Sequence, residues 1–265
     1  MHFDLVIVGA SFAGLAAART AACRGLRVAV IEAKRDVGAR IHTSGILVRE
    51  AIEEIDIPHT LTRRVPGVRL YAPNLKTADL FSPGYAFYTT DTAGLVRWMA
   101  REATAAGAHI LTATRFEGAT REPEGIIRLA GIDITARFLI GADGARSRVA
   151  QAFGLSRNRR FLTGIEVELV PNDSVDPRFL HCFVDSALAP GYIAWAAPGP
   201  EVLQVGLAVR HGDRPDLAAF MARAQRAFGW RDLTIVGRRS GLIPASGPLR
   251  KIAAPGVLLI GDAAG

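Results

Sequence analysis

The sequence predicts a mixed α/β protein in which a parallel sheet carries an inserted, mainly antiparallel sheet. Three observations support this prediction. An apolar run at residues 3–8 precedes an alanine-rich helical pattern at 14–24 and a second apolar run at 27–31. From about residue 160, strand-like runs alternate with Pro, Gly and Asp turns, which is typical of antiparallel sheets. A buried apolar run returns at 256–262, so the parallel sheet is expected to be completed late in the chain.

The remaining elements follow from local patterns. A helix is expected over 93–107, because Asp91 or Thr92 can cap its start and Gly107 marks its end. A further helix is expected near 48–55, with short β-like pieces over 68–90 that Pro and Gly interrupt. Strands are expected at 109–114, 115–121, 126–130, 132–136, 161–170, 179–184, 192–197, 202–209 and 233–239, and one more helix near 217–228.

The first segment has the strand–turn–helix–strand–acid layout of a dinucleotide site, as in Rossmann-like folds. Gly9 permits the sharp turn, and Gly14 lets the helix pack close to the strand. The helix start offers unpaired N–H groups to a pyrophosphate. Glu32 can accept hydrogen bonds from the two ribose hydroxyls. Its charge would repel a 2′-phosphate, so the adenosine half is expected to be unphosphorylated.

The fingerprint departs from its usual form at one position, where Ser11 replaces the middle glycine. Its hydroxyl is small and could bond a phosphate oxygen. An ordinary strand–helix turn is the alternative, but the flanking strand, the helix and the acid all favour a dinucleotide site. The expected cofactor-binding residues of this segment are Gly9, Ser11, Phe12, Ala13, Gly14, Glu32 and Ala33.

Composition excludes several classes. The chain has 265 residues and a formal net charge of +7, but its basic residues form no block with interleaved aromatics, so nucleic-acid binding is not expected. Two separate cysteines exclude a redox dithiol, and isolated histidines argue against a metal site. The apolar stretches are too short for a membrane span, and no basic leader is present. A cytoplasmic location is expected, with contact to a membrane surface left open.

Two later segments extend the argument. Each is an apolar run ending in small residues and an acid, at Asp143-Gly144 and at Gly261-Asp262. In this order, with the N-terminal fingerprint, they resemble the flavoprotein hydroxylase superfamily, whose type member is p-hydroxybenzoate hydroxylase. The resemblance implies FAD, a Rossmann-like FAD-binding domain and an inserted substrate-binding sheet domain. The predicted FAD-binding domain comprises residues 1–68, 88–158 and 250–265, and the predicted substrate-binding domain comprises 69–87 and 159–249.

The resemblance also assigns roles to single residues. Gly9, Ser11 and Gly14 would lie on the pyrophosphate, and Glu32 on the adenosine ribose. Asp143-Gly144 would shape the turn beside the pyrophosphate and ribose, and Asp262, after Gly261, would bond the ribityl chain. Arg40 resembles an arginine that these flavoproteins place near the cofactor. Thr43 and Gly45, with Ser44 between them, would lie near the isoalloxazine ring.

A finer resemblance lies at residues 190–198, which look like the pocket-lining segment of geranylgeranyl reductases and related prenyl reductases. Tyr192 and Trp195 would line an isoprenoid pocket there; two ordinary core aromatics are the alternative. On a regular strand the two would face opposite ways, so a bulge or strand end is needed to bring them together. Two departures weaken the match: Ala197 replaces a phenylalanine, and residues 43–45 lack the cysteine common in the reductases.

These observations predict an FAD-dependent oxidoreductase that reduces carbon–carbon double bonds of an apolar, isoprenoid-like substrate by hydride transfer from reduced flavin. A flavin-dependent monooxygenase and a non-catalytic Rossmann-like binding protein remain as alternatives. NADPH or another electron donor, which includes a donor protein, would act as a transient reductant. No catalytic acid is assigned, with Tyr192 the nearest candidate. The family continues with a helix after Gly-Asp, whereas the sequence stops at Gly265, so a fragment and an incomplete flavin site both remain open.

Overall fold

The computed structural model describes residues 1–171 and 173–265, and the chain passes repeatedly between two units. Unit 1 consists of Met1–Ala39, Val96–Phe161 and Pro244–Gly265, and unit 2 of Arg40–Leu95 and Leu162–Ile243. Residues 40–68 and 88–95, which the sequence analysis placed in the FAD-binding domain, therefore belong to unit 2. They do so because they bond to one another: Leu47 bridges Tyr88, and the Thr90 hydroxyl donates to the Gly45 carbonyl over 2.8 Å.

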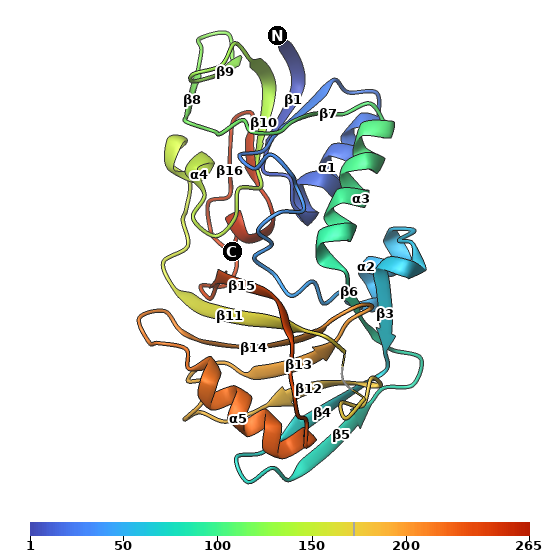
Figure 1. Ribbon diagram of the computed structural model, residues 1–265. Coiled ribbons are helices and arrows are strands. Elements are labelled where there is room, and N and C mark those ends of the chain that lie inside the picture. Colours follow the sequence, from blue (N-terminus) through green and yellow to red (C-terminus); the bar gives the residue numbers. More distant parts are fainter. Residues whose placement is uncertain (172) are drawn as a thin grey trace. The chain divides into compact units, whose positions relative to one another are not determined.

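Unit 1 is built on a sheet whose strands run in the order β16-β17-β10-β1-β2-β7 (Figure 1). The β1–β2, β1–β10, β10–β17 and β2–β7 pairs are parallel. A hairpin of β8 and β9 continues antiparallel from β10. The strands are β1 (His2–Val8), β2 (Val28–Ile31), β7 (His109–Leu111), β8 (Ala119–Arg121), β9 (Ile127–Leu129), β10 (Thr135–Gly141), β16 (Ala253–Ala254) and β17 (Val257–Leu259).

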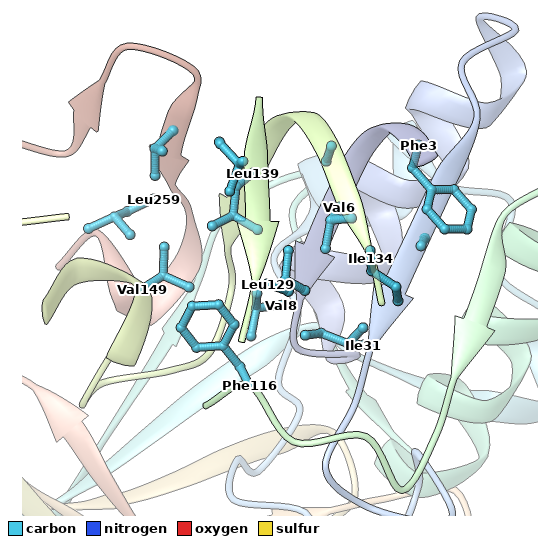
Figure 2. Packing of buried hydrophobic residues seen from close by; sticks show 14 of the residues in the cluster. Phe3, Val6, Val8, Ile31, Phe116, Leu129, Ile134, Leu139, Val149 and Leu259 are labelled. Carbon is cyan, nitrogen blue, oxygen red and sulfur yellow. The ribbon is translucent and has the colours of Figure 1, made fainter. Parts of the chain in front are cut away.

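Strand β1 is buried along most of its length on both faces, which explains its unbroken apolar run. Helix α1 (Phe12–Cys23) packs on β1 and β2. Figure 1 shows α1 and helix α3 (Thr92–Ala105) on the same side of these strands. On the other side, Val6, Val8, Ile31 and Leu139 pack with Phe116, Leu129 and Val149 in one buried cluster (Figure 2). This cluster joins the sheet to the β8–β9 hairpin and to helix α4 (Arg148–Ala152).

The parallel register brings four strand ends to one edge. Val8 pairs with Ile31 on one side and with Gly141 on the other, and Gly141 pairs with Leu259. Carboxyl ends of parallel strands share an edge of the sheet, and ligands of open α/β sheets bind there. The segments that follow β1, β2, β10 and β17 therefore meet at this edge.

Unit 2 contains a mainly antiparallel sheet in the order β15-β11-β14-β13-β12-β4-β5, in which the β12–β4 pair is parallel. Its strands are β4 (Gly67–Tyr71), β5 (Thr77–Phe81), β11 (Phe161–Leu169), β12 (Phe179–Phe183), β13 (Ala194–Pro198), β14 (Leu203–Arg210) and β15 (Ile235–Pro244). A separate pair is formed by β3 (Thr62–Val65) and β6 (Phe87–Thr90). The shorter helices are α2 (Arg49–Glu54), η1 (His59–Leu61) and, in unit 1, η2 (Gly261–Ala263).

Helix α5 (Leu217–Phe228) covers one face of this sheet (Figure 1). Asp216 caps its start by accepting from the Ala219 N–H over 2.9 Å, and Gly229 ends it at a φ of 69°. Phe220 and Ala224 are buried against inward-facing residues of β11 and β14, such as Val167 and Val205. The opposite face carries a second, smaller apolar cluster, which includes Leu180, Ala197 and Trp195.

The predicted fold class is confirmed, and most expected elements lie within a few residues of the observed ones. Three differences have physical causes. The strand expected at 132–136 begins only at Thr135 and continues to Gly141 as β10, because it pairs with β1 along this length. Helix α4 was not expected; it begins where Ser147 accepts from the Ala150 N–H over 2.9 Å. The strand expected from Tyr192 begins only at Ala194, after a turn.

The described residues form neither a membrane-spanning helix nor a metal-binding cluster. None of their helices is long and apolar enough to cross a membrane. No group of three or more His, Cys, Asp or Glu side chains in residues 1–171 and 173–265 is arranged to hold a metal ion.

Candidate cofactor-binding site

The turn after β1 depends on two glycines. Gly9 has a φ of 105°, and a Cβ there would collide with the Ala142 carbonyl oxygen. A Cβ on Gly14 would collide with the Gly9 carbonyl oxygen and lie 3.3 Å from the Ala142 Cβ. Both positions therefore require glycine so that α1, the end of β1 and the end of β10 can approach one another.

The start of α1 is open to an anion. Ser11 is its N-cap, but the serine side chain makes no capping hydrogen bond and is exposed. The first helical bond runs from the Leu15 N–H to the Ser11 carbonyl over 2.9 Å, so the preceding N–H groups of Phe12, Ala13 and Gly14 have no helical acceptor. A pyrophosphate fits this arrangement of N–H groups and hydroxyl.

Glu32 does more than the sequence analysis assigned to it. The residue is only 8% exposed, and its Oε2 accepts from the Ala10 N–H over 2.9 Å. Its Oε1 accepts from the Lys34 N–H over 2.8 Å. Glu32 thus ties the end of β2 to the glycine turn, and each oxygen keeps a lone pair for a ribose hydroxyl. Ala33 is exposed beside it.

Asp143 offers a second unused acceptor. Its Oδ2 accepts from the Arg148 N–H over 2.6 Å and from the Val149 N–H over 3.1 Å, which holds the start of α4. Its Oδ1 is buried and has no hydrogen-bond partner among the described residues. A buried acceptor is costly unless a donor reaches it, so a hydroxyl-bearing ligand fits here. Gly144, at a φ of 81°, turns the chain beside it.

The Gly261-Asp262 motif lies against the start of α1, which follows the glycine turn. Gly261 has a φ of 57°, and a Cβ there would lie 2.9 Å from the Ala13 Cβ at the start of α1. The Asn158 side-chain amide donates to the Asp262 carbonyl over 2.8 Å and to the Ala145 carbonyl over 3.2 Å. The second and third motifs are therefore joined to each other as well as to the glycine turn, and together their residues fit a dinucleotide.

The segment expected near the isoalloxazine ring belongs to unit 2 and is held by side chains. The Thr90 hydroxyl donates to the Gly45 carbonyl over 2.8 Å, and the Thr92 hydroxyl to the Ser44 carbonyl over 3.2 Å. Arg239 donates from Nη1 to the Thr43 carbonyl over 2.9 Å. Gly45 has a φ of 67°, and a Cβ there would collide with both threonine hydroxyls.

Two residues near this segment, Arg40 and Thr92, have features that the sequence did not indicate. Arg40 adopts a left-handed φ of 46°, which is uncommon for a residue other than glycine. The Thr92 hydroxyl accepts from Arg239 Nη1 over 3.3 Å. A guanidinium therefore does bond to this segment, but it comes from β15. The sequence analysis did not single out Arg239, since no local pattern distinguishes it from the other arginines.

Trp195 crosses a neighbouring strand to reach a buried carboxyl. Trp195, Gly206 and Glu166 are opposite one another on β13, β14 and β11. A Cβ on Gly206 would lie 2.7 Å from the indole Cζ2, so glycine clears a path for the ring. The indole Nε1 donates to Glu166 Oε2 over 2.8 Å. Tyr192, 45% exposed, lies in the turn before β13, and the structure does not pair it with Trp195.

Glu166 is the centre of a polar cluster that the sequence analysis missed. Glu166 is 5% exposed, and its Oε1 is buried with no hydrogen-bond partner among the described residues. This oxygen lies 3.8 Å from Arg239 Nη1. Arg239 also forms an ion pair with Glu168. Burial raises the pKa of Glu166 to about 7, although the Trp195 hydrogen bond and Arg239 oppose the rise. Glu166 can therefore hold a proton at neutral pH.

Comparison with known proteins agrees with this geometry. A family model described as an FAD binding domain matches residues 2–265. The chain belongs to this FAD-binding family. It is 30% identical to the digeranylgeranylglycerophospholipid reductase of Methanothrix thermoacetophila, over 100% of this chain and 71% of the relative. It is 28% identical to the reductase of that name from Methanosarcina acetivorans, over 99% of this chain and 69% of the relative.

Solved structures give the same result. A geranylgeranyl bacteriochlorophyll reductase-like protein from Thermoplasma acidophilum superposes with a TM-score of 0.87 and 25% identity, over 99% of this chain and 71% of that one. Aklavinone-11 hydroxylase, solved with FAD and aklavinone, shares the fold alone, with a TM-score of 0.75, 18% identity, and coverage of 99% and 57%. The family member described here is thus an FAD-dependent oxidoreductase, distantly related to geranylgeranyl lipid reductases.

Proposed function

We propose that this oxidoreductase reduces carbon–carbon double bonds in an apolar, isoprenoid-like substrate. The observation that carries the proposal is Trp195, whose partly buried ring lies against Gly206 and packs with the apolar residues Leu180 and Ala197. An aromatic wall with a tethered N–H suits a long hydrocarbon chain, since it offers apolar area and a fixed orientation. The reductase relatives support the same substrate class.

The chain's own residues would bind and orient the cofactor. We propose that the pyrophosphate lies at the start of α1, on Gly9, Ser11 and the N–H groups of Phe12, Ala13 and Gly14. Glu32 and Ala33 would contact the adenosine ribose, and Asp143, Gly144, Gly261 and Asp262 the remaining ribose and ribityl hydroxyls. Arg40, Thr43 and Gly45 would lie nearer the ring. When bound, FAD supplies the redox chemistry that no side chain can.

The substrate side is assigned to unit 2. We propose that Trp195 contacts the substrate and that Tyr192, at the turn before β13, borders the same region. Reduction of a double bond also needs a proton. The exposed Tyr192 was the earlier candidate, but Glu166 is a better one, because it is buried beside Trp195 with a pKa near neutrality. NADPH or another electron donor is proposed as the reductant.

The test is a single-turnover assay. FAD-loaded protein is reduced without oxygen and mixed with a lipid that carries geranylgeranyl chains, and the flavin spectrum and product mass are followed. Reoxidation coupled to a gain of two hydrogens per double bond is expected. Trp195→Ala should slow the step and keep FAD bound. The control is Trp98→Ala, which changes another partly buried tryptophan, on α3, and should leave the rate of the step unchanged. A product that gains oxygen in air, with no reduction anaerobically, would identify a monooxygenase and overturn the proposal.

A further inference from the structure

Unit 1 contains a strongly cationic cavity that the cofactor site does not use. Its volume is about 860 Å³, and residues 150–160 and 246–251 contribute its lining. Five of the lining side chains are basic and none is acidic: Arg157, Arg159, Arg160, Arg250 and Lys251. The whole chain carries a formal net charge of +7. The five basic side chains that line the cavity therefore make it a centre of positive charge in the molecule.

Hydrogen bonds from backbone groups and serine hydroxyls join the two lining segments. The Ser156 N–H donates to the Lys251 carbonyl over 2.8 Å, and the Lys251 N–H donates back to Ser156 Oγ over 3.1 Å. At the other end, Ser246 Oγ accepts from the N–H groups of Arg159 and Arg160 over 3.3 and 3.1 Å. The Ala245 N–H donates to the Arg160 carbonyl over 2.9 Å. The walls of the cavity are thus bonded to each other at both ends.

The basic side chains lack acidic partners. Within residues 1–171 and 173–265, none of the five forms an ion pair with a carboxylate; Lys251 Nζ donates to the Gly154 carbonyl over 3.1 Å. Like charges held in one hollow repel one another, and a bound anion would relieve that repulsion. Guanidinium groups match phosphate oxygens with two parallel N–H donors.

The cavity is also connected to the flavin motifs. The Leu249 N–H donates over 2.9 Å to the carbonyl of Ala264, two residues after Asp262. Asn158, between two of the arginines, bonds to the carbonyls of Ala145 and Asp262. A ligand in the cavity would therefore contact segments that are bonded to two of the three cofactor motifs.

We propose that this cavity binds a ligand through its phosphate groups. Two sources share this chemistry: a soluble phosphorylated nicotinamide dinucleotide that delivers electrons, and the headgroup of a phospholipid substrate. The choice of these two sources rests on the proposed function, because a reductase of isoprenoid lipids needs both a reductant and a lipid. The phosphate site itself rests on the charges and the geometry of unit 1.

The experiment uses FAD-saturated protein, so that the start of α1 is occupied. Pyrophosphate binding is measured by titration calorimetry for the wild type, for Arg157→Gln/Arg159→Gln/Arg250→Gln, and for a control triple that loses equal charge elsewhere in unit 1. The control triple is Arg19→Gln/Arg101→Gln/Arg121→Gln, three exposed arginines outside the cavity. We expect the cavity triple to weaken binding by about tenfold or more, and the control by less than about twofold.

Two further arms identify the source. NADPH is compared with NADH, and vesicles of phosphatidylcholine with phosphatidic acid are compared with phosphatidylcholine alone. If the wild type prefers NADPH to NADH and the cavity triple loses this preference, the ligand is the dinucleotide. If the wild type prefers the acidic vesicles and the cavity triple loses that preference, the ligand is the lipid headgroup. Equal losses in both triples, or no binding of any of the phosphate probes by the wild type, would overturn the proposal. Pyrophosphate binding does not depend on turnover, so a failed reductase assay leaves this result interpretable.

Discussion

Replacing the buried Glu166 by glutamine tests the polar cluster of unit 2 most directly. The amide keeps the shape of the carboxyl, and its oxygen can still accept from the Trp195 indole N–H, but it cannot ionise. In the folded chain, burial raises the pKa of Glu166 from 4.5 to about 7. Between these values the folded state binds more protons than the unfolded state, so folding stability falls as the pH rises.

The size of the effect follows from the same two values. Each tenfold change in the protonation ratio corresponds to about 1.4 kcal/mol, so ionising Glu166 destabilises the folded chain by about 3 kcal/mol above pH 7. Below pH 4.5 both states are protonated and the penalty vanishes. For a chain of this size, about 3 kcal/mol corresponds to a melting temperature difference on the order of 5–10 °C.

The assay is a series of thermal melts of FAD-saturated wild type and Glu166→Gln from pH 5 to pH 8. The melting temperature of the variant minus that of the wild type should rise from pH 5 to about pH 7 and then level off. Taking the difference removes other groups, such as His181, whose pKa is lowered by burial, and Asp36, whose pKa is lowered by Arg97. A difference that stays constant with pH would show that Glu166 is ionised throughout this range. It would refute the raised pKa of Glu166 and the balance between burial, Arg239 and Glu168 that sets it.

Three further substitutions test the sites. Glu32→Ala should weaken FAD binding by about 1–3 kcal/mol, because the ribose loses charge-assisted bonds and the Ala10 N–H loses its acceptor; unchanged affinity in a fluorescence titration would exclude both roles. Gly206→Ala should lower the free energy of unfolding by about 1–3 kcal/mol, because the new methyl would lie 2.7 Å from the Trp195 ring; a urea titration that matches the wild type would show that the ring moves freely. Asp143→Ala should reduce FAD content, which is read from visible absorbance, because it removes the unpaired Oδ1 and the bonds to the start of α4; full flavin content would show that Asp143 makes no contact that matters.

Local patterns were enough to predict the first β-strand, the glycine turn, α1 and the acid after β2, since each depends on neighbours within a few residues. The same holds for α5, which was expected near 217–228 and which the structure bounds with Asp216 and Gly229. The identity of the cofactor was predicted from the sequence through a family resemblance, which the motifs around Gly9, Asp143 and Gly261 carry.

The tertiary structure decided what these strand ends share and what surrounds them. Parallel pairing of β1, β10 and β17 brings the three motifs to one edge, which no local pattern specifies. Glu166, Trp195 and Arg239 come from three strands distant in sequence, so their cluster, and the raised pKa within it, arises only on folding. The cationic cavity likewise needs residues 150–160 and 246–251 to be bonded side by side. Periodicity reports on which face of an element is buried, whereas burial of a charge depends on which distant chain segments cover it.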